Sequence, residues 1–109
     1  MRAAHLYVAQ RISALVMAPL VLAHLALIVY AAQDGLSGAE ILARTRGSPF
    51  WAGFYGLFVA AAAVHAAIGL RTVAAETFGW RGRGLDLAAL AVGLVLLALG
   101  GRAVAAVVS

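Results

Sequence analysis

The chain alternates long apolar stretches with short segments that carry its charges. Residues 12–32 and 50–70 contain no charged side chain, and a third apolar run begins at residue 87. A helix needs about 20 apolar residues to cross the bilayer core of roughly 30 Å. The first stretch is also longer than the apolar core of a signal peptide, which has about 7 to 15 residues. The pattern predicts an all-α integral membrane protein with three transmembrane helices, over about residues 12–32, 49–78 and 86–108.

Local signals indicate where these helices begin, bend and end. Ser48 followed by Pro49 is a favoured helix start, because serine caps free backbone N–H groups and proline fits the first helical position. The second helix should continue beyond the bilayer to Phe78 and stop at Gly79. Pro19 removes a backbone hydrogen bond from the first helix and is predicted to kink it.

The polar segments predict the remaining elements. Residues 1–11 form a mildly polar lead-in that we expect at the membrane interface. Ser37 and Glu40 have the spacing of a capping box, which predicts a short surface helix before the second membrane helix. We therefore predict a single membrane domain, residues 1–109, in which a short interfacial helix accompanies the three membrane helices.

Composition limits the cofactors and partners that the chain can bind. Of the 109 residues, 65% are hydrophobic and 11% are charged, which is unlike an ordinary soluble domain. The chain has no cysteine, so it supplies no disulfide, zinc knuckle or cysteine-ligated iron–sulfur cluster, and a cofactor would have to be held by histidine. All basic residues are arginines, and they lie at the ends of apolar stretches. This distribution indicates membrane topology rather than nucleic-acid binding.

The arginines also predict which end of the helices faces the cytoplasm. Three crossings place the N-terminus and the second loop on one side, with the first loop and the C-terminus on the other. The first side has the larger share of arginine: Arg2, Arg11, Arg71, Arg81 and Arg83, against Arg44, Arg46 and Arg102. The positive-inside rule then places the N-terminus on the cytoplasmic side.

The principal candidate for chemistry is His65, because an imidazole is costly to bury in lipid and marks a functional site by default. On a helical wheel, small or short residues such as Ala61, Gly69 and Thr72 share its face, together with Glu76. This face can accept a closely packed helix or the flat edge of a cofactor. The sequence of this helix alone does not distinguish the two interpretations. His5 lies outside the apolar stretches, and we expect it to be solvated.

Two short motifs lie near the inner ends of the first two predicted helices. They are Gln10-Arg11-Ile12-Ser13 and His65-Ala66-Ala67-Ile68-Gly69-Leu70-Arg71. With three helices and the N-terminus inside, they resemble the cytochrome b membrane-anchor subunits of succinate dehydrogenase and fumarate reductase, respiratory complex II. The chain departs from the family at three positions. Gln10 and Thr72 stand where members often have histidines, and Glu76 stands where they usually have aspartate.

The resemblance implies a non-catalytic anchor in the cytoplasmic membrane that binds the flavoprotein and iron–sulfur subunits. Electrons from succinate would reach quinone, with haem b nearby and His65 as a ligand of the haem iron. The family's quinone positions map onto Arg11 and Ser13, whose guanidinium and hydroxyl suit quinone carbonyl oxygens. Arg71 suits a haem propionate, because guanidinium pairs well with carboxylate. Alternatively, Arg11 only anchors the topology and Ser13 only bonds its own helix backbone.

The depths of the two membrane histidines bear on how haem is bound. His24 lies about 18 Å from the inner end of the first predicted helix and His65 about 7 to 8 Å from that of the second, a difference of roughly 10 Å. Two axial nitrogens of one iron lie only about 4 Å apart. Each histidine therefore needs a partner elsewhere.

The family's di-haem single-chain anchors take histidines from their first two helices and from two later helices that repeat them. By that resemblance we expect two anchors, identical or similar, to pair into a larger helical bundle. His65 would then serve an inner haem and His24 an outer one. In the alternative, His24 packs at the kink after Pro19, and a single haem uses His65 and a histidine from an unlike subunit.

Two other classes of protein also fit three apolar helices. A small transporter or channel protomer would use His24 and His65 as packing or proton-relay residues. Such a protein should carry acidic side chains within its spans, whereas the acidic residues here lie in loops or at helix ends, at Asp34, Glu40, Glu76 and Asp86. A structural membrane subunit without a cofactor is the third class.

Overall fold

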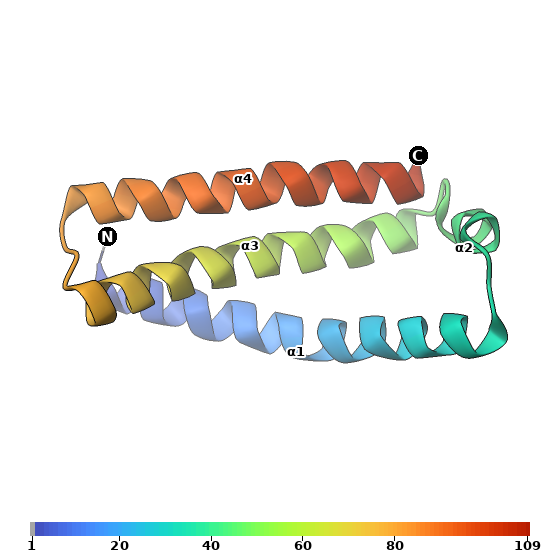
Figure 1. Ribbon diagram of the computed structural model, residues 1–109, viewed down its shortest axis with the longest axis horizontal. Coiled ribbons are helices and arrows are strands. Elements are labelled where there is room, and N and C mark those ends of the chain that lie inside the picture. Colours follow the sequence, from blue (N-terminus) through green and yellow to red (C-terminus); the bar gives the residue numbers. More distant parts are fainter. Residues whose placement is uncertain (1) are drawn as a thin grey trace.

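A computed structural model describes residues 2–109, which form four α-helices (Figure 1). Their bounds are α1 (Ala3–Asp34), α2 (Gly38–Thr45), α3 (Pro49–Phe78) and α4 (Arg83–Val108). The three long helices α1, α3 and α4 are each long and apolar enough to cross a membrane. The predicted class, an all-α membrane protein with three spans and a short additional helix, is confirmed.

The first helix begins earlier than the sequence indicated. α1 starts at Ala3 rather than near residue 12, so the polar lead-in is helical and the predicted boundary was wrong. Leu6 and Gln10 of this segment line a cavity together with Ile68 of α3, so tertiary packing supports the additional turns. At its other end α1 stops at Gly35, whose left-handed φ of 66° allows the next amides to bond back to the helix. Figure 1 shows α1 changing direction near its middle, the region of Pro19.

The local signals around α3 were sufficient. This helix has the predicted bounds, with the Ser48 hydroxyl accepting a hydrogen bond from the Trp51 amide at 3.3 Å and Gly79 ending the helix at a φ of 66°. α4 begins at Arg83, three residues before the predicted start, which shortens the second loop to residues 79–82.

The short helix α2 closes one end of the molecule. Ser37 and Glu40 form the predicted capping box, with the Glu40 amide donating to the Ser37 hydroxyl at 3.2 Å. The Thr45 hydroxyl donates to the Val107 carbonyl at 2.5 Å, and the Gly47 amide donates to the Val108 carbonyl at 2.7 Å. A helix leaves its last carbonyls without partners, so these bonds satisfy the end of α4 and fix α2 beside it.

The central helix is α3, with α1 on one side and α4 on the other (Figure 1). Its contact with α4 is made of small side chains, because an alanine side chain at Gly93 would lie 3.4 Å from the Ala67 methyl group. Ala63 and Ala75 of α3 and Ala89 of α4 are buried. Lipid gives helices no hydrophobic reason to associate, so close packing of small residues is what joins them.

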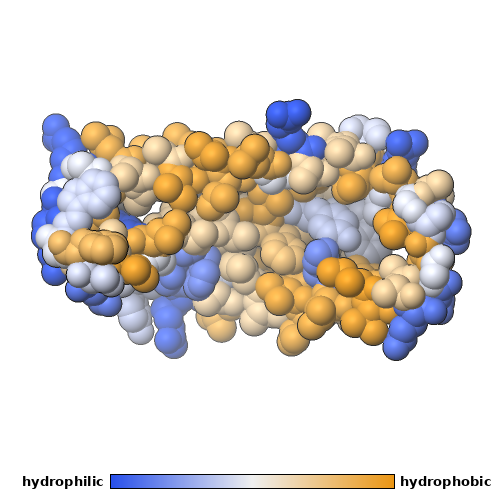
Figure 2. Space-filling view, in the orientation of Figure 1, coloured by the Kyte–Doolittle hydropathy of each residue, from blue (hydrophilic) through white to orange (hydrophobic). Residues whose placement is uncertain are grey.

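The large apolar side chains face outward instead. Leu15, Leu22 and Leu94 are each more than half exposed, as expected for residues that meet lipid. Figure 2 shows hydrophobic residues over most of the middle of the visible face and hydrophilic residues gathered mainly at its two ends. The N-terminus and loop 79–82 lie at one end of the molecule, called the inner end below, and α2 lies with the C-terminus at the outer end (Figure 1). This is the predicted arrangement of the connections.

Candidate functional site

Two of the candidate residues, Ser13 and His65, meet where α1 crosses α3. The Ser13 hydroxyl donates a hydrogen bond to the Gln10 carbonyl at 2.9 Å, and its oxygen lies 3.4 Å from His65 Nδ1. Ser13 is only 5% exposed and His65 is partly buried. The sequence assigned Ser13 to a quinone site and His65 to a haem, and the structure adds their direct contact.

The small-residue face beside His65 is partly filled by α1. A Cβ atom added at Gly69 would lie 3.5 Å from Nε2 of Gln10, so at this point the neighbouring helix occupies the predicted slot. The side-chain oxygen of Gln10 is buried and has no hydrogen-bond donor within residues 2–109. A buried acceptor without a donor carries a cost in free energy, which the close packing of α1 on α3 offsets at this point.

Arg71, the predicted propionate partner, already has a carboxylate partner. Its Nε donates to Oδ1 of Asp86 at 2.8 Å, and this ion pair joins α3 to the first turn of α4. Both side chains are about a quarter exposed, at 22% and 24%. A guanidinium carries five N–H donors, so the bond through Nε leaves four others. Sequence reasoning missed Asp86 as the partner, although its position at a helix start was visible.

Arg11, the predicted quinone contact, lies on the outside of α1. It is exposed, and its guanidinium carbon lies 5.8 Å from the centre of the Tyr7 ring. Arg11 and Ser13 therefore differ in accessibility, because the serine is buried against α3. The structure does not bring the two side chains to one common surface.

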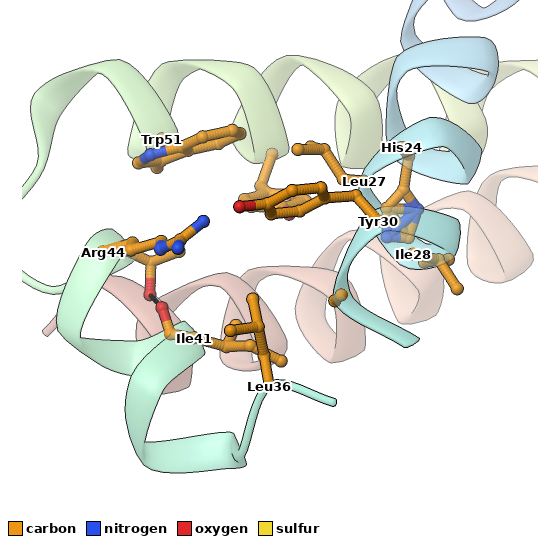
Figure 3. Close-up of a pocket in the computed structure, with 11 residues that line it drawn as sticks. His24, Leu27, Ile28, Tyr30, Leu36, Ile41, Arg44 and Trp51 are labelled. Atoms are coloured by element: carbon orange, nitrogen blue, oxygen red, sulfur yellow. Dashed lines mark hydrogen bonds between the residues drawn. The ribbon is translucent and has the colours of Figure 1, made fainter. Parts of the chain in front are cut away.

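His24 lies in a different kind of environment, nearer the outer end. Its ring makes edge contacts with Tyr55 at 5.8 Å and Phe58 at 5.5 Å between ring centres. It also lines a cavity of about 210 Å³ between α1, α2 and α3 (Figure 3). In Figure 3, Tyr30 and Arg44 point toward one another at the other end of this cavity. A second cavity of about 340 Å³ also contains His24 and extends to α4.

The two histidines lie at clearly different levels. His65 is beside Ser13, and His24 follows Ser13 by eleven residues, which corresponds to about 16 Å along a helix. His24 contacts Tyr55 and Phe58, which precede His65 on α3 by ten and seven residues, or about 15 and 10 Å of helix rise. The two helices thus give a difference in level of about 10 to 16 Å, a range that includes the predicted value of roughly 10 Å. Within residues 2–109, no group of three or more His, Asp or Glu side chains is placed to share a metal ion.

The fold and the site define a multi-pass α-helical membrane protein with one histidine at each of two levels. A family model for the succinate dehydrogenase/fumarate reductase transmembrane subunit matches residues 2–101. The chain therefore belongs to this family, as the motifs predicted. A search of curated proteins and a search of solved structures gave no match.

Proposed function

We propose that the protein is a haem b-binding membrane anchor of succinate:quinone oxidoreductase. Family membership supports the anchor role and favours it over a transporter or channel. The observation that carries haem binding is the placement of His65, a membrane histidine whose Nδ1 faces the Ser13 hydroxyl at a helix contact. Haem b supplies reversible one-electron transfer at its iron when it is bound.

The residues present suit such a group. His65 would offer its second ring nitrogen to the haem iron, and the remaining N–H donors of Arg71, about 9 Å nearer the inner end by helix rise, would bind a propionate. Arg71 and Gln10 line one cavity near the inner end, whereas His65 faces Ser13 of α1 and Arg71 is also paired with Asp86 of α4.

Each histidine needs a partner ligand from a second anchor chain. The roughly 10 to 16 Å between the levels of His24 and His65 exceeds the roughly 4 Å between two nitrogen ligands on opposite sides of one iron. We propose that two anchors pair, identical or similar, with His65 serving an inner haem and His24 an outer one. The ring contacts of His24 with Tyr55 and Phe58 are also compatible with simple packing, and the number of haems per anchor pair distinguishes the two roles.

Arg11 is our candidate for contact with quinone. Its guanidinium is exposed near the inner end, where it can donate to a quinone carbonyl oxygen. The quinone contact of Ser13 remains a prediction, and its hydroxyl is already bonded to the Gln10 carbonyl. The flavoprotein and iron–sulfur subunits would bind at the inner end, and the excess of arginine there supports a cytoplasmic N-terminus in the cytoplasmic membrane.

The decisive experiment compares two variants in the assembled complex. His65→Ala should remove most of the reduced b-type absorption while the anchor still inserts into the membrane. Arg11→Leu should keep haem and lower succinate:quinone activity, with succinate oxidation by a soluble acceptor preserved. Normal haem content in His65→Ala would refute the ligand assignment, and absence of haem from the unsubstituted complex would favour the cofactor-free subunit. Undiminished quinone reduction in Arg11→Leu would remove Arg11 from the site.

A further inference from the structure

The contact between Ser13 and His65 determines which ring nitrogen carries a proton. A serine hydroxyl has a single hydrogen to donate, and Ser13 gives it to the Gln10 carbonyl at 2.9 Å. The 3.4 Å contact with His65 Nδ1 can then be a hydrogen bond only if the ring nitrogen donates and the serine oxygen accepts. A neutral imidazole has one N–H group, so a proton on Nδ1 leaves Nε2 with a free lone pair.

We infer that Ser13 is a positioning residue, which holds His65 as the Nδ1–H tautomer and leaves Nε2 to bind iron. This inference rests on the proposed haem function and extends it to a residue outside the coordination shell. Histidines that bind metals generally donate their other N–H to a neighbouring acceptor, which fixes both tautomer and ring orientation. Ser13 provides such an acceptor from a different helix, fifty-two positions away in the sequence.

Local packing makes Ser13 suitable for this role. The hydroxyl bonds to a carbonyl of its own helix, three residues earlier, which fixes its rotamer and directs an oxygen lone pair toward α3. Gly69 lies one helical turn from His65 and has no side chain, so Gln10 and its helix approach α3 closely. Ser13 is 5% exposed, and in such a dry environment a hydrogen bond is stronger and more directional than in water.

A role of Ser13 in quinone binding would require its hydroxyl to donate in a different direction. Quinone carbonyl oxygens accept hydrogen bonds, so a serine that binds quinone must donate its hydrogen to the quinone. In this structure that hydrogen is used by Gln10, and the side chain is buried between α1 and α3. Loss of the hydroxyl should therefore alter His65 and the haem first, and quinone reduction only as a consequence.

The first test needs no haem. The full chain, labelled with ¹⁵N-histidine and purified without haem in detergent, reports the tautomer of each histidine through its nitrogen chemical shifts. His65 should carry its proton on Nδ1, and Ser13→Ala should shift it toward the Nε2–H form. Ser13→Thr keeps a hydroxyl and should restore the original tautomer. Ser37→Ala is the matched control, because Ser37 caps α2 and lies far from His65 along the fold.

The second test uses the assembled complex. Ser13→Ala should weaken haem binding by about tenfold, as removal of a ligand's hydrogen-bond partner typically does. It should also make the haem reduction potential more positive, because an imidazole that donates no hydrogen bond is a poorer electron donor to ferric iron. A purely structural role for Ser13 would leave the potential of the remaining haem unchanged. Ser13→Thr should return both quantities toward those of the unsubstituted protein.

The outcomes separate this inference from the proposed function. The inference alone would be overturned if the protein binds haem but His65 of the haem-free chain carries its proton on Nε2, or if Ser13→Ala changes neither tautomer nor potential. A protein that binds no haem overturns the proposed function, even if His65 is the Nδ1–H tautomer. If Ser13→Ala fails to fold, the tautomer of the unsubstituted chain and the response of Ser13→Thr still decide the question.

Discussion

The two membrane histidines are held by different physical means. His65 faces a buried hydroxyl, so its ring is oriented by a directional hydrogen-bonding partner. His24 lies between the edges of two aromatic rings and beside cavities of about 210 and 340 Å³, so shape and dispersion position it. A directional partner selects one tautomer, whereas edge contacts with rings do not. Under our proposal, the inner histidine is therefore the one that is already oriented for haem iron.

The difference begins with the residues that α3 presents to α1. Near the inner end Gly69 allows the Gln10 side chain to approach closely, and near the outer end Tyr55 and Phe58 meet His24. Bulky rings hold helices farther apart than glycine does, which leaves room for the cavities beside His24. α2 then covers the outer opening, and Ile41 and Thr45 line both cavities.

The largest expected effect comes from removing the outer histidine. If His24 serves a second haem, His24→Ala should lower the haem content of a paired anchor from two to one and spare the inner haem. Haem per anchor chain, measured from the absorption of the reduced pyridine complex, checks this. His5→Ala is the matched control, because His5 is exposed in the first turns of α1. One haem per anchor pair that is unaffected by His24→Ala would show that His24 only packs.

A smaller effect should follow from filling the contact between α3 and α4 near the outer level. In Gly100→Ala the new methyl group would collide with Val59 Cγ1, with the Val59 Cβ only 3.2 Å away. Overpacking of this kind costs about 1 to 3 kcal/mol, because a β-branched side chain cannot turn aside easily. Unfolding of the detergent-solubilised protein by sodium dodecyl sulfate measures the loss.

The neighbouring glycine supplies the control for this comparison. A methyl group at Gly101 meets nothing within 4 Å, so Gly101→Ala should be neutral or slightly stabilising. Val59 also lines the larger cavity beside His24, so Gly100→Ala should disturb the outer level and leave the inner haem in place. Equal destabilisation by the two substitutions would contradict the packing described for α3 and α4.

The smallest effect is expected at the outer end, where α2 is hydrogen-bonded to the end of α4. Thr45→Val removes the hydroxyl that donates to the Val107 carbonyl and should lower the free energy of unfolding by about 1 kcal/mol. Hydrogen exchange should increase in α2 and the last turn of α4, and remain unchanged around Ser13. Thr77→Val is the control, because Thr77 is exposed on α3. Faster exchange throughout the chain would indicate general unfolding instead of a loosened outer end.

The helix boundaries show how far local signals reach. Ser48, Pro49 and Gly79 predicted both ends of α3, because a cap, a first-turn proline and a left-handed glycine act within a few residues. The start of α1 was misplaced since its first turns are polar and have no comparable signal before Ala3. Leu6 and Gln10 line a cavity together with Ile68 of α3. This packing between residues far apart in the sequence supports the first turns of α1, and no local sequence pattern can predict it.

The sequence by itself determined the class of protein, the number of membrane spans, the short capped helix and the family, because charge-free length and short motifs are properties of contiguous residues. It also singled out Ser13, His24, His65 and Arg71. Only the tertiary structure decided how they are arranged, because their neighbours come from other helices: Ser13 beside His65, Asp86 beside Arg71, and aromatic rings around His24. A shift in the register between α1 and α3 leaves every hydrophobic stretch intact and changes all of these contacts, so hydropathy alone cannot fix them.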